Sequence, residues 1–567
     1  MDAAGKPPRW IMLLVLAGVG LPYVINLGAS SIWDTNEAFY AETPREMIES
    51  GDYLAPKFNY EPRTQKPPLT YWLVLLSYRA FGVGEFALRL PGALAAIGCL
   101  FFTCRIGSLL FSGWAGLAAM AILGTTVRFF VLARRLPIDI LLLFCLTGTA
   151  FFLVKSCRDG ALRTWIGAWL FAGFGVLTKG PIAAVIPAAA VLAAALWTRK
   201  WRISVSRAAS ALLVQIAVAG PWYFLIYRRL GWDYIETFFL RDNLSRFALE
   251  YLGPARGPGY YFGVFFVDFF PWSILAVPAL FAYLANRRAS RDLQDSPYAF
   301  LLAWCLFVFV FFSLSKNKQE YYIAPIYPML AVLMSGMMHK MNAAVEVARS
   351  ERASRLWRWS FLLVSLALVG VSVSVLILLP AAIPDLSPLL TYLPAGAFFL
   401  ASLIPAVVAV RARLSVGFGG LALSLWPLFI LAALVYLPAA EPYRPVRDLC
   451  SLIAAHAADG DDVGYYRVSV PSMVFYLQRP IFEEFDPDSM TARFRGPGRV
   501  FCLLSEQDHN HFVGQRDLIL YVLERRKRLA TNIRSLLNEN ARIAQELLLV
   551  SNRAASEAPA SGGSDIP

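Results

Sequence analysis

Charged side chains are scarce in this sequence of 567 residues. Asp, Glu, Lys and Arg together make up 16% of the chain, 57% is hydrophobic, and the mean hydropathy is +0.53. This composition excludes an ordinary soluble globular protein. Apolar runs of roughly 18 to 25 residues recur along the chain, which is the length that crosses the hydrocarbon core of a bilayer as a helix. The sequence therefore predicts a polytopic α-helical membrane protein.

Residue types that build nucleotide and metal sites are also rare. No glycine-rich motif that would cradle phosphates is present, so a nucleotide is not expected as donor or cofactor. There are four histidines, and His509 and His511 lack a third ligand nearby. We therefore predict no metal ligands and no cofactor, while a requirement for a divalent metal stays open. Cys450 and Cys502 lie in the polar C-terminal part, where a disulfide and two buried free thiols are both open.

The positive charge follows the pattern of a membrane protein. The formal net charge is +13, but most Lys and Arg lie in short loops between apolar runs. We therefore expect the chain to contact membrane lipids and not to bind nucleic acid. With the N-terminus in the cytoplasm, every predicted cytoplasmic loop is basic, and about thirteen spans place the C-terminal region outside. The expected spans cover residues 10–28, 87–110, 114–133, 137–155, 164–178, 181–198, 208–227, 260–285, 298–314, 322–338, 358–380, 393–410 and 415–437.

The chain divides into three parts. Residues 1–437 form the predicted transmembrane domain, with no removable signal peptide evident and with a large external loop over 29–86. Within this loop the short apolar run 69–82 is expected to lie in the membrane interface. Short strand-like and helix-like runs predict a small extracytoplasmic α/β domain over 438–553. The last segment, 554–567, is rich in Ala, Ser, Gly and Pro and is expected to be disordered.

Two carboxylates and a lysine in the external loop are the first candidates for a site. Asp34 and Glu37 are three residues apart, and on a helical turn such residues share a face. A carboxylate here can deprotonate or orient an acceptor hydroxyl, and a solvated acid or helix cap is the alternative. Two prolines follow Lys66 and hold the preceding backbone extended, which suits an ammonium group that binds phosphate. The alternative is an interfacial lysine that reaches lipid headgroups.

Further candidates lie at other predicted external ends. Asp139 begins a span, where an acid needs a partner or a polar cavity. Arg246 can form a bidentate pair with a phosphate. The alternatives are structural pairing for Asp139, a tight turn at Lys179 and membrane anchoring for Tyr322. The predicted set comprises the catalytic residues Asp34, Glu37 and Asp139 and the substrate-binding residues Lys66, Arg134, Lys179, Arg246, Lys316 and Tyr322. All fall on one side of the membrane, which predicts an outward-facing pocket for a charged headgroup.

The spacing of these residues resembles a known family. Asp34-x-x-Glu37, then Tyr40-Ala41-Glu42 and Lys66-Pro67, are similar to the aminoarabinose lipid A transferases and, more distantly, to the protein O-mannosyltransferases. Both belong to the GT-C glycosyltransferase class. Later elements follow in the family's order over roughly residues 10–340. The motifs are Ala133-Arg134 with Asp139, Thr178-Lys179-Gly180, Arg246-Phe247, Phe270-Pro271-Trp272-Ser273, and Ser313-Leu314-Ser315-Lys316 through Tyr322 to Pro325.

The resemblance implies a GT-C-like fold and a sugar donor carried on a polyprenyl phosphate. It places Asp34 near the reacting centre and Asp139 at a second acidic position. It also places Lys66, Arg246 and Tyr322 at the lipid phosphate. In the aminoarabinose enzymes the acid pair is usually adjacent, whereas here it is split, so that Asn36-Glu37 competes with Asp34 for the key role.

A second departure concerns the acceptor. The residue before the family's lysine is often acidic, and here it is Gln65, so lipid A is not assumed as acceptor. The expected function is an integral-membrane glycosyltransferase of the bacterial inner membrane. It moves a sugar from a polyprenyl-phosphate carrier to a lipid, glycan or protein acceptor on the extracytoplasmic face by single displacement. The alternatives are a lipid or sugar transporter (flippase), which predicts charges within the spans, and a scaffold, which leaves the charged set unexplained.

Overall fold

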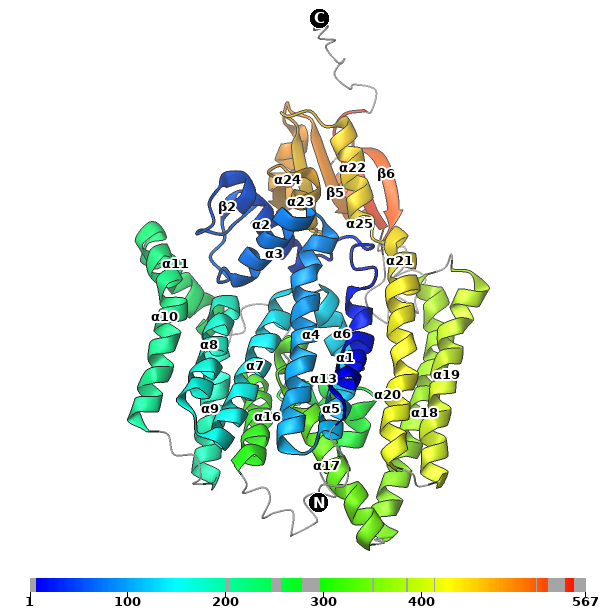
Figure 1. Cartoon of the computed structure of the whole chain (residues 1–567). Coiled ribbons are helices and arrows are strands. Elements are labelled where there is room, and N and C mark those ends of the chain that lie inside the picture. The colour runs from blue at the N-terminus through cyan, green and yellow to red at the C-terminus, as the bar shows by residue number, and fades with distance from the viewer. Residues whose placement is uncertain are drawn as a thin grey trace, which may run out of the picture.

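The structure is a computed structural model that describes residues 7–135, 137–198, 204–245, 256–277, 296–348, 351–383, 386–411, 414–516, 518–528 and 546–554. A bundle of helices makes up most of the molecule, and a smaller part built on a β-sheet covers one end of it (Figure 1). The expected tail 554–567 lies outside the described residues except for its first residue.

Within the described ranges, six helical segments are long and apolar enough to cross a membrane, or seven if one bent pair is a single span. The six are α4 (Glu85–Leu110), α7 (Pro137–Asp159), α10 (Val205–Leu230), α18 (Glu351–Ala382), α19 (Pro388–Arg411) and the run Gly417–Ala439 through α20 (Leu414–Leu431), η3 (Ala432–Tyr436) and α21 (Leu437–Ala439). The bent pair is α5 (Gly113–Gly124) and α6 (Val127–Arg135), which meet at 69°. The chain is a multi-pass membrane protein, and the count of about thirteen spans stays a prediction.

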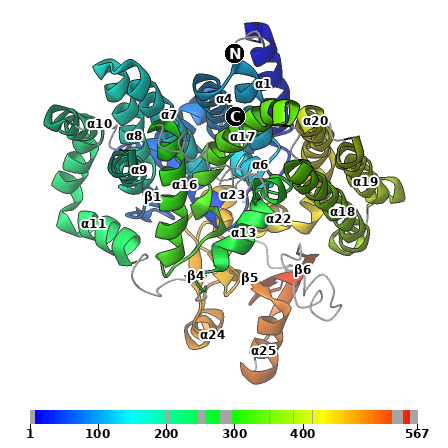
Figure 2. The ribbon, with the colours of Figure 1, turned by 90° about the horizontal axis from the view of Figure 1, so that it is seen from below.

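Further helices complete the bundle. They are α1 (Arg9–Val24), α8 (Leu162–Lys179), α9 (Ile182–Thr198), α11 (Trp232–Glu236), η1 (Thr237–Ser245), α13 (Tyr260–Asp268), α16 (Ser296–Leu314), η2 (Glu320–Ile323) and α17 (Ile326–Ala348). Seen from below, α10 and α19 lie at opposite sides, with α4, α7, α16 and α17 between them (Figure 2). Small residues let helices approach closely. For example, a Cβ atom placed on Gly107 of α4 would lie only 2.9 Å from the Cα atom of Gly116 in α5.

The external loop folds over the same end of the bundle as the sheet. It contains α2 (Asn36–Ser50), the short hairpin of β1 (Lys57–Phe58) and β2 (Glu61–Pro62), and α3 (Leu69–Phe81). The ring centroids of Tyr40 in α2 and Tyr71 in α3 lie 5.7 Å apart in a stacked arrangement. The hydroxyl of Tyr78 donates to the carbonyl of Ala41 at 3.0 Å. These contacts pack α2 onto α3, and α2 ends at Gly51, whose φ of +68° suits glycine.

The C-terminal part holds a five-stranded mixed sheet in the order β4-β3-β5-β7-β6. The expected strands correspond to β3 (Asp462–Tyr466), β4 (Phe482–Glu484), β5 (Val500–Ser505) and β7 (Glu546–Ser551), and β6 (Tyr521–Lys527) is added at the edge. Strands β3, β4 and β5 run parallel, whereas β7 is antiparallel to both β5 and β6. The helices of this part are η4 (Glu441–Tyr443), α22 (Val446–His456), α23 (Ser472–Leu477), α24 (Pro487–Arg495) and α25 (Glu506–Arg516).

The two faces of this sheet settle the cysteine alternatives. Side chains alternate along β5, so that Phe501 and Leu503 enter one hydrophobic core and Cys502 and Leu504 enter the other. Cys450 lies in the core of Phe501, on the opposite face from Cys502. Both cysteines are buried free thiols, and the disulfide alternative is wrong.

Hydrogen bonds dock the sheet part onto the external loop. The amide side chain of Asn59 donates to the carbonyl of Ile481 at 2.8 Å and accepts from its N–H at 2.9 Å. Two further contacts lie nearer α1, where the N–H of Ile32 donates to the hydroxyl of Tyr476 at 2.8 Å. There the N–H of Ser31 also donates to both carboxylate oxygens of Glu441, at 2.9 and 3.0 Å. The loop that carries the predicted acids is therefore held between the bundle and the C-terminal part.

Candidate functional site

The structure brings Asp139, Lys179 and Tyr322 together. Asp139 lies in the first turn of α7, and Lys179 is the last residue of α8, before Gly180 with a φ of +90°. Their side chains form an ion pair in which the carboxylate is 8% and the ammonium group 18% exposed. The Nζ atom of Lys179 lies 5.0 Å from the ring centroid of Tyr321 and 5.4 Å from that of Tyr322, both in η2. We call these four side chains the acid–lysine cluster.

The external loop reaches this cluster through Tyr40. Burial raises the pKa of Tyr40, and the neighbouring Tyr71, Asp139 and Tyr321 raise it further, so its hydroxyl stays protonated as a donor. The Nε atom of Arg63 donates to the hydroxyl of Tyr71 at 3.0 Å. Neither Tyr40 nor Arg63 is in the predicted site, although Tyr40 belongs to a motif that carries the family resemblance. An aromatic residue on an apolar helix face gives no signal of its own in a sequence.

Asp34 and Glu37 do not share a helical face, so this expectation is wrong. Helix α2 begins at Asn36, and Asp34 therefore precedes it. One carboxylate oxygen of Asp34 accepts from the N–H of Ser472 at 2.8 Å and the other from its hydroxyl at 2.7 Å. Ser472 is the first residue of α23, in the C-terminal part. Burial raises the pKa of Asp34 to about 6, against the opposing effect of the two bonds from Ser472.

Glu37 forms a buried ion pair with Arg89. Its carboxylate accepts from the Nε atom of Arg89 at 2.7 Å and from an Nη atom at 2.9 Å, and the two side chains are 1% and 2% exposed. The remaining N–H groups of Arg89 donate to the carbonyls of Leu27, Ser30 and Ser31. This ion pair fixes the turn that leads from α1 into α2.

Arg134 binds backbone carbonyls at the C-terminal end of α1. Its guanidinium donates to the carbonyls of Pro22 at 2.7 Å, Ile25 at 2.8 Å and Asn26 at 3.1 Å. The last carbonyls of a helix lack partners within it, and a buried arginine satisfies them here.

The other predicted cations are Lys66, Lys316 and Arg246. The ammonium group of Lys66, in the segment before α3, donates to the carbonyl of Gln65 at 2.9 Å. Lys316 is exposed in the loop between α16 and η2. In the same loop the buried Lys318 donates to the carbonyl of Ser315. Arg246 lies outside the described residues.

A second buried charged group was missed by the sequence analysis. The guanidinium of Arg128, at the start of α6, binds both carboxylate oxygens of Asp268 in α13 at 2.9 Å. The hydroxyl of Tyr327 donates to the same carboxylate at 2.9 Å, and Glu320 of η2 lies 3.8 Å from Arg128. The available signal was an aspartate inside an apolar run, two residues before Phe270 of the Phe270-Pro271 motif.

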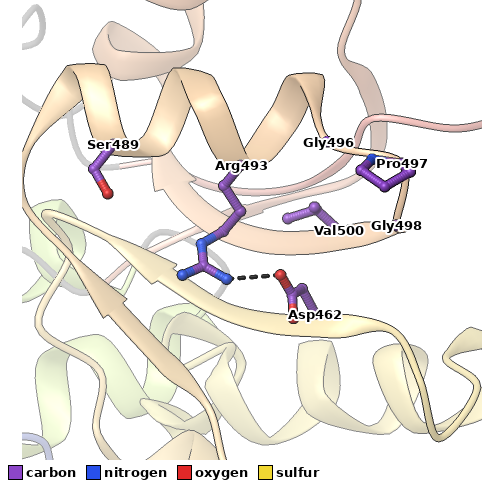
Figure 3. Close-up of a pocket in the computed structure, with 7 residues that line it drawn as sticks. All are labelled: Asp462, Ser489, Arg493, Gly496, Pro497, Gly498 and Val500. Atoms are coloured by element: carbon purple, nitrogen blue, oxygen red, sulfur yellow. Dashed lines mark hydrogen bonds and ion pairs between the residues drawn. The ribbon is translucent and has the colours of Figure 1, made fainter.

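The described ranges hold no group of three or more His, Cys, Asp and Glu side chains that could bind a metal ion, and the question of a divalent metal stays open. A hollow of about 290 Å³ lies in the C-terminal part, beside the first residues of β3 and β5 (Figure 3). There Arg493 and Asp462 form an ion pair at 2.6 Å. This hollow shares no residue with the acid–lysine cluster.

Comparison with known proteins decides the class. Residues 65–224 match the family of dolichyl-phosphate-mannose-protein mannosyltransferases. The chain is 30% identical over 483 residues to an uncharacterized protein of Aquifex aeolicus, covering 83% of this chain and 87% of that protein. It is 30% identical over 349 residues to an undecaprenyl phosphate-alpha-4-amino-4-deoxy-L-arabinose arabinosyl transferase of Pseudomonas fluorescens. The crystal structure of ArnT from Cupriavidus metallidurans bound to undecaprenyl phosphate superposes with a TM-score of 0.75 at 19% identity, covering 98% of this chain and 100% of ArnT.

The chain is a GT-C glycosyltransferase. The resemblance seen in the sequence is confirmed, and so is the prediction of an enzyme of this class. This GT-C enzyme aligns with 57% of the length of the Pseudomonas fluorescens transferase and 59% of its own. Its likeness to ArnT, at 19% identity, shows the fold.

Proposed function

We propose that this GT-C enzyme moves a sugar from a polyprenyl-phosphate carrier to a lipid, glycan or protein acceptor on the extracytoplasmic face of a bacterial inner membrane. The observation that carries the proposal is the acid–lysine cluster, at the end of the bundle that the external loop covers. The names of two relatives support the donor class, since one is an undecaprenyl phosphate arabinosyl transferase and the other was solved with undecaprenyl phosphate.

Lys179 is the proposed partner of the donor phosphate. Asp139 pairs with it and fixes its direction, while the aromatic rings of Tyr321 and Tyr322 border it. A phosphate oxygen can take the place of the carboxylate on the ammonium group, because Lys179 remains 18% exposed. Lys66, Arg246 and Lys316 are the proposed further cations. Together they offset the negative charge that grows on the phosphate as it leaves the sugar.

Asp34 is the proposed base for the acceptor. Of the three predicted acids, Glu37 has both oxygens bound to Arg89, and Asp139 is paired with a lysine. Among the described residues, Asp34 accepts its hydrogen bonds from the neutral Ser472, and its pKa of about 6 leaves it ionised yet basic near neutral pH. It takes the acceptor proton as the acceptor oxygen attacks the anomeric carbon and the lipid phosphate leaves. A single displacement of this kind inverts the anomeric centre.

The test is a mass-spectrometric comparison of lipids from cells with the wild-type protein, without it, and with Lys179→Gln. Arg525→Gln serves as the control, because it removes a cation from an exposed ion pair in the C-terminal part. We expect a polyprenyl-phosphate sugar to accumulate in the deletion and in Lys179→Gln, and not in the control. A normal amount of this lipid and unchanged surface glycans in the deletion would contradict the transferase. Accumulation of the carrier sugar on the cytoplasmic side alone would favour a transporter.

A further inference from the structure

Two arginines lie against the same tryptophan beside Asp34. The Cζ atom of Arg135, the last residue of α6, is 3.2 Å from the ring centroid of Trp33. The Cζ atom of Arg444, at the end of η4, is 4.3 Å from it. Arginine stacks on aromatic faces, but this attraction replaces only part of the stabilisation that an ion pair gives. The three side chains come from the external loop, the bundle and the C-terminal part, and we call them the Trp33 cluster.

The acids around this cluster already have partners, and Asp34, whose pKa burial raises and the nearby Arg444 lowers, accepts from Ser472 at both oxygens. Glu37 is bound to Arg89, and Glu85 accepts from Tyr476 and pairs with Arg447. Glu441 accepts from the N–H of Ser31 at both oxygens and lies 3.2 Å from Arg447. It reaches Arg444 only at 3.5 Å.

Arg135 has no carboxylate partner in the part of the chain that the structure describes. Among the described residues no carboxylate lies within ion-pair distance of its guanidinium, which is only partly exposed. The Nε1 atom of Trp33 is buried and has no hydrogen-bond partner among the described residues. Burial lowers the pKa of Arg444 to about 10, although the nearby Glu441 and Glu37 raise it. A partly buried cation without a counter-ion and a buried donor without an acceptor both lower stability. An anion placed here would supply both missing partners.

We propose that Arg135, Arg444 and the indole N–H of Trp33 bind a phosphate or carboxylate group of the acceptor. Guanidinium groups match the oxygens of such groups through paired N–H donors. Trp33 precedes the proposed base Asp34 in the chain, whereas the proposed donor site is the separate ion pair of Asp139 and Lys179. The anion site therefore lies on the acceptor side, and the acceptor belongs to the class of anionic lipids or glycans. This inference rests on the proposed function for its assignment to the acceptor, and on the geometry alone for the anion site.

The first test measures anion binding without any reaction. The full-length protein is held in nanodiscs of phosphatidylcholine, and its thermal midpoint is titrated with inorganic phosphate and, separately, with phosphatidic acid in the disc. Ligands that bind the folded state raise the midpoint. We expect the double variant Arg135→Gln with Arg444→Gln to need about tenfold more of the anion, or more, for half of the effect. The control Arg447→Gln removes a nearby cation that has its own acids and should keep the wild-type response. Replacing Arg135 by lysine instead of glutamine (Arg135→Lys) keeps the charge, so part of the stabilisation by the anion should return.

The second test separates the two substrates. In a transfer assay with lipid extracts, we expect the double variant to raise KM for the acceptor and to leave KM for the polyprenyl-phosphate donor unchanged. A rise in KM for the donor alone would assign the cluster to the donor phosphate and overturn the acceptor assignment. Equal stabilisation of the wild type and the double variant by both anions would overturn the site itself. Anion binding that depends on the two arginines, with no transfer by any form of the protein, would retain the site and reject the proposed function.

Discussion

Two buried ion pairs at the end of the bundle that the loop 29–86 covers differ in how many hydrogen bonds the cation makes. The pair Glu37–Arg89 is 1% and 2% exposed. Six protein oxygen atoms accept from the guanidinium: both carboxylate oxygens of Glu37, the carbonyls of Leu27, Ser30 and Ser31, and the hydroxyl of Ser30. The pair Asp139–Lys179 is 8% and 18% exposed, and the ammonium group has aromatic rings as its other neighbours. The N–H groups of Arg89 already donate to protein oxygen atoms, whereas we propose that Lys179 exchanges its carboxylate partner for a phosphate oxygen. Charge and burial are similar in the two pairs. What differs is how many N–H groups of the cation already donate to protein oxygen atoms.

The largest effect is expected from breaking the first pair. Glu37→Ala leaves a buried guanidinium without its acid, which should lower the free energy of unfolding by about 3–5 kcal/mol. The measurement is chemical unfolding of the purified protein in detergent, with Arg525→Gln as an exposed control. An unchanged unfolding midpoint for Glu37→Ala would show that the pair does not hold the loop.

The second pair should behave in the opposite way. Lys179→Gln is expected to lower the rate of transfer by about 10²–10³-fold, because a preorganised charge at the leaving phosphate is lost. Its effect on unfolding should be smaller than that of Glu37→Ala, since the Asp139 carboxylate left behind is 8% exposed, against 2% for the guanidinium of Arg89. Rates from single-turnover transfer and midpoints from unfolding are measured on the same preparations. A variant that unfolds as readily as Glu37→Ala would remove the difference between the two pairs.

Asp34 adds a pH dependence that distinguishes catalysis from stability. Its pKa is raised to about 6 by burial, so the base is lost and the transfer rate should fall as the pH drops below about 6. Its contribution to stability has the opposite sign. A raised pKa in the folded state means that the contribution is fully present below the pKa of the unfolded chain and is lost as the pH rises through about 6.

Ser472→Ala sharpens this prediction. The hydroxyl bond from Ser472 lowers the pKa of Asp34, so its removal should raise that pKa and move the acid limb of the rate profile to higher pH. Ser472→Thr keeps a hydroxyl and should restore the wild-type limb. A profile that does not move in Ser472→Ala would argue that a group other than Asp34 controls the limb.

The smallest effect is expected at the exposed pair in the C-terminal hollow. Arg493 and Asp462 are 32% and 54% exposed, so Arg493→Gln should change the free energy of unfolding by less than about 1 kcal/mol. Transfer rates should stay at the wild-type level. A loss of transfer in this variant would give the hollow a role in the reaction.

The sequence predicted that Asp139, Lys179 and Tyr322 lie at one end of the bundle, because topology depends on local charge; the extracytoplasmic location of this end stays a prediction. Basic loops identify one side of the membrane, and Asp139, Lys179 and Tyr322 then fall together at the other ends of their helices. Partners that lie far apart in the chain were not predictable. Asp34 binds Ser472 from the C-terminal part, and Arg134 binds carbonyls at the end of α1. Such pairings depend on packing between segments, which no local pattern of charge or hydrophobicity records.

The same limit explains the groups that were missed. Arg128 and Asp268 are 140 residues apart and meet only through the packing of α6 against α13. Tyr40 is placed near Asp139 by the stacking of α2 on α3. Four of the five strands of the C-terminal part could be located from their sequence pattern, whereas β6 was not predicted. The placement of Cys450 and Cys502 on opposite faces followed only from the packing of α22 and the alternation along β5.

The most direct measurement is consumption of the lipid donor by the purified full-length protein. Polyprenyl-phosphate sugars are extracted from cells that lack the protein, incubated with the wild type and with Lys179→Gln, and followed by mass spectrometry. The account predicts that the wild type converts a carrier sugar to free polyprenyl phosphate in the presence of acceptor, and that Lys179→Gln does so about 10²–10³-fold more slowly. Equal consumption by both proteins would contradict the role of the Asp139–Lys179 pair, and no consumption by the wild type in the presence of acceptor would contradict the proposed transferase.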